Sequence, residues 1–276
     1  MTAEDRKFET EEPSRKVYSV PAAEKVIDIL EFMSDRADGL TPTEIAAAMG
    51  KSVHEIYRVL LVLEARGYLY KRNGSEGYRL SLKLFELAHR LPSMRRLSDS
   101  ALDVMQGLAP ATLQSCHLSV MSGHELLIVL QVDSPLPMRY SVMLGAKFDF
   151  SETSAGTVIF ACSPEGTKEK ALNWLKEQGR SQADIRDVND RAAQILRDGH
   201  EMRESLAVAG VINIAAPIFD HVGNVVAALT VPYVPQRAAT VSQDRVRKLA
   251  LEAAAAISAN LGAKPRPGPT SATAEG

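Results

Sequence analysis

Apolar residues recur with the period of a helix near the start of the chain. They begin just after Pro21 and stop before the Asp38-Gly39 turn, which ends the pattern. This stripe predicts a helix whose buried positions are Ala22, Ala23, Val26, Ile27, Leu30 and Met33.

A short second helix is predicted by its N-terminal residues. Thr41 is followed by Pro42 at the first helical position and by Glu44 three residues after the cap. Such a Thr-x-x-Glu capping box satisfies two backbone N–H groups, and proline is favoured at that first position. We expect this helix to end at Gly50.

A third helix follows after one intervening residue. Ser52 and Glu55 form another capping box, and the helical pattern runs to Gly67. The residues expected on its buried face are Ile56, Val59, Leu60 and Leu63. Two capped helices joined by a short turn that contains glycine, with a longer helix before them, are typical of a helix-turn-helix.

A β-hairpin is predicted directly after the third helix. Residues 68–72 are β-prone, residues 73–77 are a turn cluster (Asn-Gly-Ser-Glu-Gly), and residues 78–80 resume the strand. A hairpin at this place is a wing, so the first part of the chain is predicted to be a winged helix-turn-helix that binds DNA.

The rest of the chain predicts an α+β domain with an antiparallel sheet, because strands precede and follow a block of helices. Strands are expected at 117–121, 125–132, 138–144, 211–219 and 224–231. Helices are expected at about 94–116 with an interruption near Pro110, and at 153–162, 164–178, 187–198 and 242–261.

These patterns divide the chain into five segments. They are a disordered tail (1–18), the winged helix-turn-helix (19–80), a linker helix (81–93), an effector-binding domain (94–262) and a second disordered tail (263–276).

Composition narrows the class of protein. The chain has 276 residues, 45% of them hydrophobic and 24% charged, which suits two globular domains. Residues 21–90 hold ten Lys or Arg and ten Asp or Glu, so DNA binding must come from uneven placement of charge. The two cysteines have no metal or redox spacing, and no apolar run reaches the roughly 20 residues of a membrane span. We therefore expect a cytoplasmic protein without membrane contact.

Six segments, taken in their order and spacing, resemble the IclR family of transcriptional regulators over about residues 18–262. The resemblance implies a winged helix-turn-helix, a linker helix, a GAF-like effector domain for a small organic or aromatic acid, and a homodimer or homotetramer on a palindromic operator. The segments are SVPAAEKVIDILEFM, LTPTEIAAAMG, YRVLLVLEARGYL, GYRLSLKLFELA, GAKFDFSETSAGTVIFA and GVINIAAPIFDHVGNVVAALTV.

The sequence departs from the family pattern at two places. Residues 53–56 read Val-His-Glu-Ile where the family has a short Ser/Thr-rich stretch, which bears on the operator sequence. Residues 153–157 read Thr-Ser-Ala-Gly-Thr where Thr-Ala-x-Gly-Lys is common, which bears on the pocket entrance.

Double-stranded operator DNA is the expected partner of the third helix and the wing. Phosphate contacts need cations and base edges need donors or apolar contacts. For Lys71 and Arg72 the alternative is a plain solvated charge, and for Glu55 the cap role competes with a cytosine contact. The expected DNA-binding residues are Thr41, Thr43, Lys51, Ser52, Val53, His54, Tyr57, Arg58, Leu61, Lys71 and Arg72.

A small-molecule effector, expected to be a carboxylate, is the second partner. The start of the helix after Thr153 offers free backbone N–H groups that favour an anion. The alternatives are an internally bonded polar group for Asn213 or Thr230, and an ordinary surface carboxylate for Glu204. Carried over by position, the effector-binding residues are Gly145, Thr153, Ala155, Gly156, Glu204, Val211, Asn213 and Thr230.

No cofactor and no metal site are expected, because the histidines lack paired spacing. His117, His124, His200 and His221 are interpreted as structural or exposed, Cys116 as a core residue and Cys162 as an open question between core packing and a reactive thiol. A nucleophile elbow, a phosphate loop and a dinucleotide fingerprint are all missing, so we expect no enzyme. The alternatives are an enzyme acting on a small carboxylate and a winged helix that binds protein.

Overall fold

The computed structural model describes residues 19–264 except 37, 73, 74, 238 and 239. The tails predicted at 1–18 and 263–276 lie outside the described residues, apart from Ala263 and Lys264. The described chain forms two compact units, which divide between Leu91 and Pro92.

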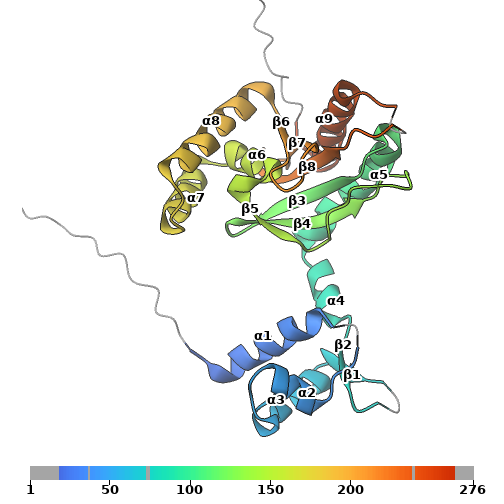
Figure 1. Cartoon of the computed structure of the whole chain (residues 1–276), viewed down its shortest axis with the longest axis vertical. Coiled ribbons are helices and arrows are strands. Elements are labelled where there is room, and N and C mark those ends of the chain that lie inside the picture. Colours follow the sequence, from blue (N-terminus) through green and yellow to red (C-terminus); the bar gives the residue numbers. More distant parts are fainter. Residues whose placement is uncertain (1–18, 37, 73–74, 238–239, 265–276) are drawn as a thin grey trace, which may run out of the picture. The chain divides into compact units, whose positions relative to one another are not determined.

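The described part of the smaller unit contains four helices and a hairpin (Figure 1). The hairpin strands pair antiparallel, with Tyr70 opposite Arg79. The order of elements is that of a winged helix-turn-helix. The elements are α1 (Pro21–Ser34), α2 (Pro42–Ala48), α3 (Val53–Ala65), β1 (Leu69–Lys71), β2 (Tyr78–Leu80) and α4 (Lys83–His89).

Both predicted capping boxes are confirmed. The Thr41 hydroxyl accepts from the Glu44 N–H while the Glu44 carboxylate accepts from the Thr41 N–H. Ser52 and Glu55 repeat the arrangement at the start of α3. Each box satisfies N–H groups that a helix start leaves without a partner, which sets where α2 and α3 begin.

The predicted apolar stripe of α1 is wrong in part. Met33 is buried as predicted, and Val26 and Leu30 are half-buried. Ala22, Ala23 and Ile27 are exposed, and the buried Ile29 was not predicted. Both Ile27 and Ile29 lie near the predicted apolar stripe, and only packing against α3 determines which of the two side chains is buried. On α3 the predicted Ile56, Leu60 and Leu63 are buried and Val59 is only partly so; the helix ends at Ala65, before the left-handed Gly67.

The larger unit is built on one antiparallel sheet of six strands in the order β5-β4-β3-β8-β7-β6. The strands are β3 (Cys116–Ser122), β4 (Glu125–Val132), β5 (Lys147–Asp149), β6 (Glu201–Glu204), β7 (Ile212–Phe219) and β8 (Val225–Tyr233). The helices are α5 (Pro92–Thr112), the 3-10 turn η1 (Phe150–Glu152), α6 (Ser154–Cys162), α7 (Glu165–Glu177), α8 (Gln182–Asp198) and α9 (Gln243–Asn260).

The two faces of this sheet carry different helices (Figure 1). One face packs on α5 and α9 through residues such as Leu118 and Leu229. The opposite face packs on α6 and α8 through Ala215 and Ala228. Because successive side chains of a strand point to opposite faces, His117 and Ser119 of β3 lie on the α6 face.

Several predicted elements of this unit need correction. Residues 138–144 form a loop and no strand, because they pair with no strand of the described sheet; Met138 and Met143 are both more than 75% exposed, while Tyr140 and Val142 are half-buried. The short strands β5 and β6 were not predicted. Helix α5 continues through Pro110, which falls in its last turn, and ends at Thr112, directly before Leu113, whose φ is 56°.

Two boundaries also differ from the prediction. Helix α8 begins at Gln182, where Ser181 and Asp184 form a third capping box, and not at residue 187. Strand β7 begins at Ile212, so the predicted placement of Val211 on that strand is wrong by one residue. Among the described residues, no helix is long and apolar enough to cross a membrane.

Candidate nucleic-acid interface and ligand pocket

Helix α3 exposes a mixed polar and apolar face. The apolar or ring side chains Val53, Tyr57 and Leu61 are 38%, 45% and 43% exposed. His54 and Arg58 are exposed on the same helix. This face supplies a cation, two ring side chains and apolar groups, which are the contacts that phosphates and base edges accept.

The helix caps occupy some residues predicted to contact DNA. The hydroxyls of Thr41 and Ser52 are engaged with Glu44 and Glu55. Glu55 is confirmed as the cap partner of Ser52, whose backbone N–H and hydroxyl lower the pKa of the Glu55 carboxyl. Lys25 also lies 3.6 Å from that carboxylate.

The wing presents its cations to solvent. The Lys71 ammonium lies 4.4 Å from the centre of the Tyr78 ring, and the hydrogen bond with Tyr78 raises the pKa of Lys71. Arg72 and Lys51 are exposed, as is Thr43 of α2.

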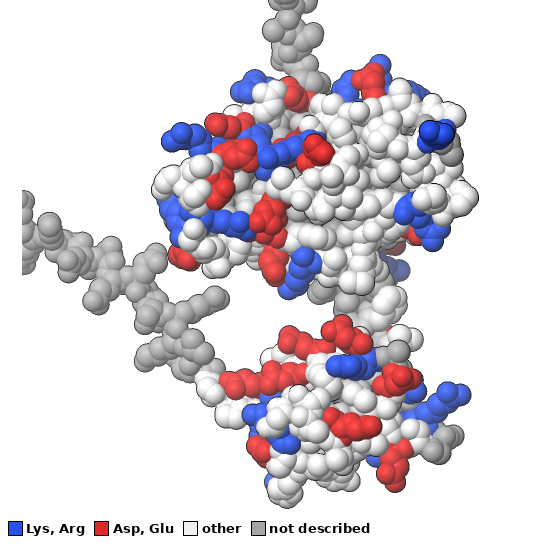
Figure 2. Space-filling view, in the orientation of Figure 1, with Lys and Arg blue, Asp and Glu red and all other residues white. Residues whose placement is uncertain are grey.

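Acidic residues of the same unit gather elsewhere, on α1. The exposed residues Glu24, Asp28, Glu31 and Asp35 line this helix, where Figure 2 shows a run of acidic atoms. Acidic side chains therefore line α1, while the exposed cations Lys51, Arg58, Lys71 and Arg72 lie in or next to α3 and the wing, together with the exposed Glu55 and Glu76.

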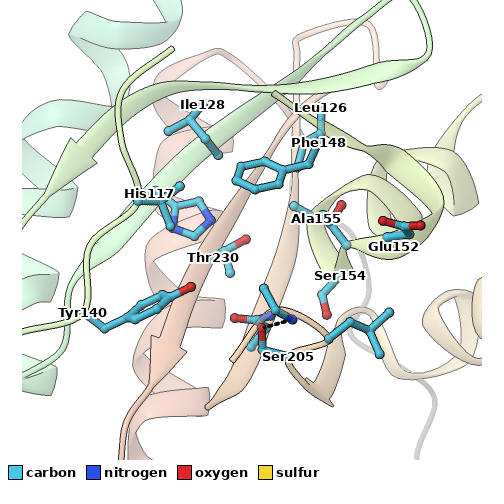
Figure 3. Close-up of a pocket in the computed structure, with 15 residues that line it drawn as sticks. His117, Leu126, Ile128, Tyr140, Phe148, Glu152, Ser154, Ala155, Ser205 and Thr230 are labelled. Carbon is cyan, nitrogen blue, oxygen red and sulfur yellow. Dashed lines mark hydrogen bonds between the residues drawn. The ribbon is translucent and has the colours of Figure 1, made fainter. Parts of the chain in front are cut away.

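The larger unit contains a pocket of about 190 Å³ on the α6 face of the sheet (Figure 3). Its floor is formed by strands β3, β4, β7 and β8, one wall by the start of α6, and its sides by the loops 133–146 and 205–211. The lining residues are His117, Leu126, Ile128, Tyr140, Val142, Phe148, Glu152, Thr153, Ser154, Ala155, Ser205, Leu206, Ala207, Asn213 and Thr230.

Backbone hydrogen-bond donors at the N-terminus of α6 face this pocket. Thr153 is the N-cap, and its hydroxyl accepts from the Gly156 N–H at 3.0 Å. Among the described residues, the backbone N–H groups of Ser154 and Ala155 have no acceptor. Two unpaired N–H groups at the positive end of a helix dipole form an anion site that needs no lysine or arginine.

A set of unpartnered polar side chains lies beside this anion site. The Nδ1 atom of His117 and the Oγ1 atom of Thr230 are buried and without a hydrogen-bond partner in the described structure. His117 is 7% and Thr230 2% exposed. Buried polar groups are normally hydrogen-bonded, so these atoms indicate a bound molecule or water that satisfies them.

Few charged side chains line the pocket. Of the described lining residues, Glu152 is the one carboxylate, and none is Lys or Arg. Burial lowers the pKa of His117 to about 4, so its ring is neutral near pH 7. Among the described lining residues, the groups available to an anion are therefore backbone N–H groups and neutral side-chain donors.

Arg191 of α8 holds the loop that leads into α6. Its guanidinium donates to the carbonyls of Ser151 and Thr153 at 2.7 and 3.2 Å, and to the Glu201 carboxylate at 2.7 and 2.9 Å. The side chains of Arg191 and Glu201 are 10% and 9% exposed. Because these bonds fix the residues just before Ser154, they fix the direction of its N–H group.

The structure brings half of the predicted effector residues together. Thr153, Ala155, Asn213 and Thr230 line the pocket. The alternative of an internal hydrogen bond does not hold for Thr230, whose hydroxyl has no partner among the described residues.

The other four predicted effector residues have different surroundings. Gly145 has a φ of +82° and donates to the Ile128 carbonyl. A Cβ on Gly156 would lie 2.2 Å from the Phe150 carbonyl oxygen, which makes it a packing glycine. Glu204 accepts from the Gly210 N–H, and Val211 is buried.

Sequence analysis missed His117, Tyr140 and the loop residues Ser205 to Ala207 as lining residues. His117 had a usable signal, because it alternates with Leu118 on a strand whose other face is apolar. The loop residues had none, since their position depends on how the loops fold over the sheet. Among the residues that the structure describes, no group of three His, Cys, Asp or Glu could hold a metal ion.

A winged helix-turn-helix joined to a pocket-containing α+β unit defines a class of transcription regulators with a sensor domain. Two family profiles match in the same order. The IclR helix-turn-helix domain matches residues 22–73, and the bacterial transcriptional regulator IclR C-terminal domain matches residues 90–259. The chain belongs to the IclR family of transcriptional regulators.

Curated relatives and solved structures agree with this placement. The regulator XynR of Escherichia coli is 23% identical over 88% of this chain and 98% of its own length, and KdgR of the same species is 26% identical over 88% and 94%. The IclR structure from Thermotoga maritima has a TM-score of 0.66 at 24% identity over 87% of this chain and 98% of its own. An IclR homolog from Microbacterium hydrocarbonoxydans, complexed with 4-hydroxybenzoate, has a TM-score of 0.72 at 21% identity over 87% and 98%.

Proposed function

We propose that this chain is a ligand-controlled regulator that binds a palindromic operator and senses a small organic acid. The observation that carries the proposal is the anion site at the start of α6, where the N–H groups of Ser154 and Ala155 face a pocket lined mostly by neutral side chains. A carboxylate satisfies both N–H groups and the helix dipole. The solved relative from Microbacterium hydrocarbonoxydans, whose complex contains a carboxylic acid, supports the same ligand class.

The DNA-binding part of the proposal rests on α3 and the wing. We assign phosphate or guanine contact to Arg58, base or backbone contact to His54 and Tyr57, and phosphate contact to Lys71 and Arg72. A palindromic operator implies two copies of the chain, with half-sites about 34 Å or a multiple apart. A homodimer or homotetramer meets this requirement.

The functions that we propose for the segments of the chain follow the two compact units. Residues 19–80 bind DNA, 81–93 link the parts, and 94–262 bind the effector. The effector changes the relative placement of two DNA-binding units in the oligomer, and half-site spacing makes DNA affinity sensitive to that placement.

The test combines DNA footprinting with an acid screen. The full chain is footprinted on the DNA flanking its own coding region, at several salt concentrations, alone and with each acid that raises its melting temperature. We expect a protected palindrome whose affinity falls with salt and changes with at least one acid, because binding to one conformation shifts the equilibrium toward it.

A Ser154→Pro variant tests the anion site, because proline removes one N–H donor at the first helical position, where it is favoured, and Thr153 before it is already extended. We expect this variant to footprint as the wild type does and to lose the acid response. A protein that protects no DNA, or whose footprint no acid alters, contradicts the proposal. Recovery of the acid chemically unchanged is also expected, since conversion would favour an enzyme.

A further inference from the structure

The pocket has a second polar end, remote from the α6 N-terminus in sequence and formed by two adjacent strands. His117 of β3 lies directly opposite Thr230 of β8 in the antiparallel register. Directly opposed residues of such a pair have side chains on the same face, so both project into the pocket (Figure 3). Neither His117 Nδ1 nor Thr230 Oγ1 has a partner in the described structure.

The chemistry of this end differs from that of the anion site. A neutral imidazole offers one donor and one acceptor, and the Thr230 hydroxyl offers one donor and accepts as well. Burial holds the pKa of His117 at about 4, so the ring presents no positive charge to an anion near pH 7. A hydroxyl group, which both donates and accepts, can bond this pair in either tautomer of the ring, whereas a carboxylate only accepts and an ammonium only donates.

Apolar side chains occupy the space around these polar groups. Leu126, Ile128 and Phe148 line the pocket, and the first two are less than 3% exposed. A buried apolar cavity of about 150 Å³ holds a benzene ring, so the roughly 190 Å³ here suits a molecule of that size with small polar substituents.

We propose that His117 and Thr230 select a hydroxyl on the effector, so that the effector is a hydroxylated monocarboxylate with an apolar middle. This inference rests on the proposed function, because it places the carboxylate of the same ligand at Ser154 and Ala155. His117 and Thr230 are then specificity-determining residues. An acid that lacks the hydroxyl leaves two buried polar atoms unsatisfied, which penalises its binding.

Bound water is the competing occupant of this end of the pocket. A buried water with several polar partners also satisfies such groups. If water stays there, acids with and without the hydroxyl have similar affinity, since both leave it in place. The relative affinity of matched acids therefore decides between the two.

The experiment is calorimetric titration of the full chain with matched probes. They are benzoate against 3-hydroxybenzoate and 4-hydroxybenzoate, and hexanoate against 6-hydroxyhexanoate. We expect the wild type to prefer the better-fitting hydroxy acid over its parent by about tenfold or more, as sites built to bond a substrate hydroxyl do. In Thr230→Val, which keeps the shape of the side chain, and in His117→Phe, we expect the preference to fall to about twofold or less.

Ser119→Ala is the matched control. Ser119 lies two residues from His117 on β3, is fully buried, and also has an unpartnered hydroxyl, but it does not line the pocket. We expect this variant to keep the wild-type preference. Circular dichroism shows which variants fold. If His117→Phe does not fold, Thr230→Val alone tests whether this end of the pocket selects a hydroxyl.

The outcomes separate the two proposals. Equal affinity of the wild type for hydroxy and parent acids, with binding retained, overturns this inference and leaves the acid-sensing function standing. A preference that survives in Thr230→Val and His117→Phe also overturns it. If none of the acids binds the wild type at all, both proposals fail.

Discussion

Gly156 and Gly107 are both helical glycines with opposite surroundings. A Cβ on Gly156 would lie 2.2 Å from the Phe150 carbonyl oxygen and 2.5 Å from its Cα, whereas a Cβ on Gly107 would meet nothing within 4 Å. Because the crowding atoms at Gly156 are backbone, the η1 turn would have to move away from α6. The turn precedes the donors of the anion site, so the shift would also reach the ligand.

We therefore predict that Gly156→Ala destabilises the larger unit by about 1–3 kcal/mol, the usual cost of overpacking. It should also weaken acid binding. Gly107→Ala is the matched control; it lies in the interior of α5 on an exposed position and should stabilise by about 0.5–1 kcal/mol through helix propensity alone. Urea denaturation followed by tryptophan fluorescence measures both. Equal stability of the two variants would show that the close packing at Gly156 does not constrain the unit.

At the residue scale, sequence patterns predicted chemistry where a local rule applied. Thr153 is a capping residue followed by a helix, and Asn213 and Thr230 are polar residues in apolar strands. His117 was interpreted as structural because a lone histidine has no partner in the sequence. The role proposed for it depends on Thr230, which is more than 100 positions away and becomes its neighbour only through the β3–β8 register.

Among the elements, α8 and β6 are tied to the loop before α6 by the Arg191–Glu201 pair. Both side chains are about nine-tenths buried, and the guanidinium also bonds two backbone carbonyls. Removing one partner of such a pair leaves the other charge buried and alone, which costs more than the pair itself contributes.

Arg191→Met should therefore lower the free energy of unfolding of the larger unit by about 3–5 kcal/mol. The double variant Arg191→Met with Glu201→Met should recover part of this loss, because no charge is then stranded. Acid affinity should stay reduced in both, since the carbonyls of Ser151 and Thr153 lose their donor. The measurements are urea denaturation and calorimetric titration.

Arg186→Met provides the comparison on the same helix. Arg186 is exposed and makes no hydrogen bond or ion pair in the described structure. We expect its loss to change stability by less than about 0.5 kcal/mol. If Arg191→Met behaves like Arg186→Met, the loop before α6 is held by other contacts.

Elements with a local start signal were predictable from the sequence, and those set by tertiary pairing were not. The boxes at Thr41 and Ser52 place α2 and α3 to within a residue. In contrast, residues 138–144 have strand-like composition but follow Pro135 and Pro137 and find no strand partner. Strands β5 and β6 have only three and four residues and exist through their neighbours β4 and β7.

For the whole molecule, the two units have separate cores. The buried residues of the smaller unit lie between Ile29 and Tyr78, and those of the two clusters in the larger unit begin at Leu97. Each unit therefore buries its own apolar surface, as an independent domain does. From the sequence we predicted two parts joined by a linker helix at 81–93, because an amphipathic helix there stops before Pro92.

The last prediction separates the two activities. A fragment of residues 92–264 contains the entire sheet, both of its helical layers and every lining residue of the pocket. It should fold, self-associate and bind the acid with the affinity of the full chain, and it should show no affinity for operator DNA. The complementary change is Arg58→Ala in the full chain, which removes an exposed cation of α3 without touching the larger unit.

We expect Arg58→Ala to weaken operator binding by about 1–3 kcal/mol, the usual loss for one base or phosphate contact, while acid affinity stays unchanged. Sedimentation, calorimetry and footprinting on the fragment and on the variant measure the three properties independently. A fragment that is unfolded, or that binds the acid more than tenfold less tightly, would place part of the pocket's stability in the smaller unit. Unaltered operator binding by Arg58→Ala would remove α3 from the DNA contact. Either result would contradict the assignment of one activity to each unit, because that assignment requires that each change affect one binding partner only.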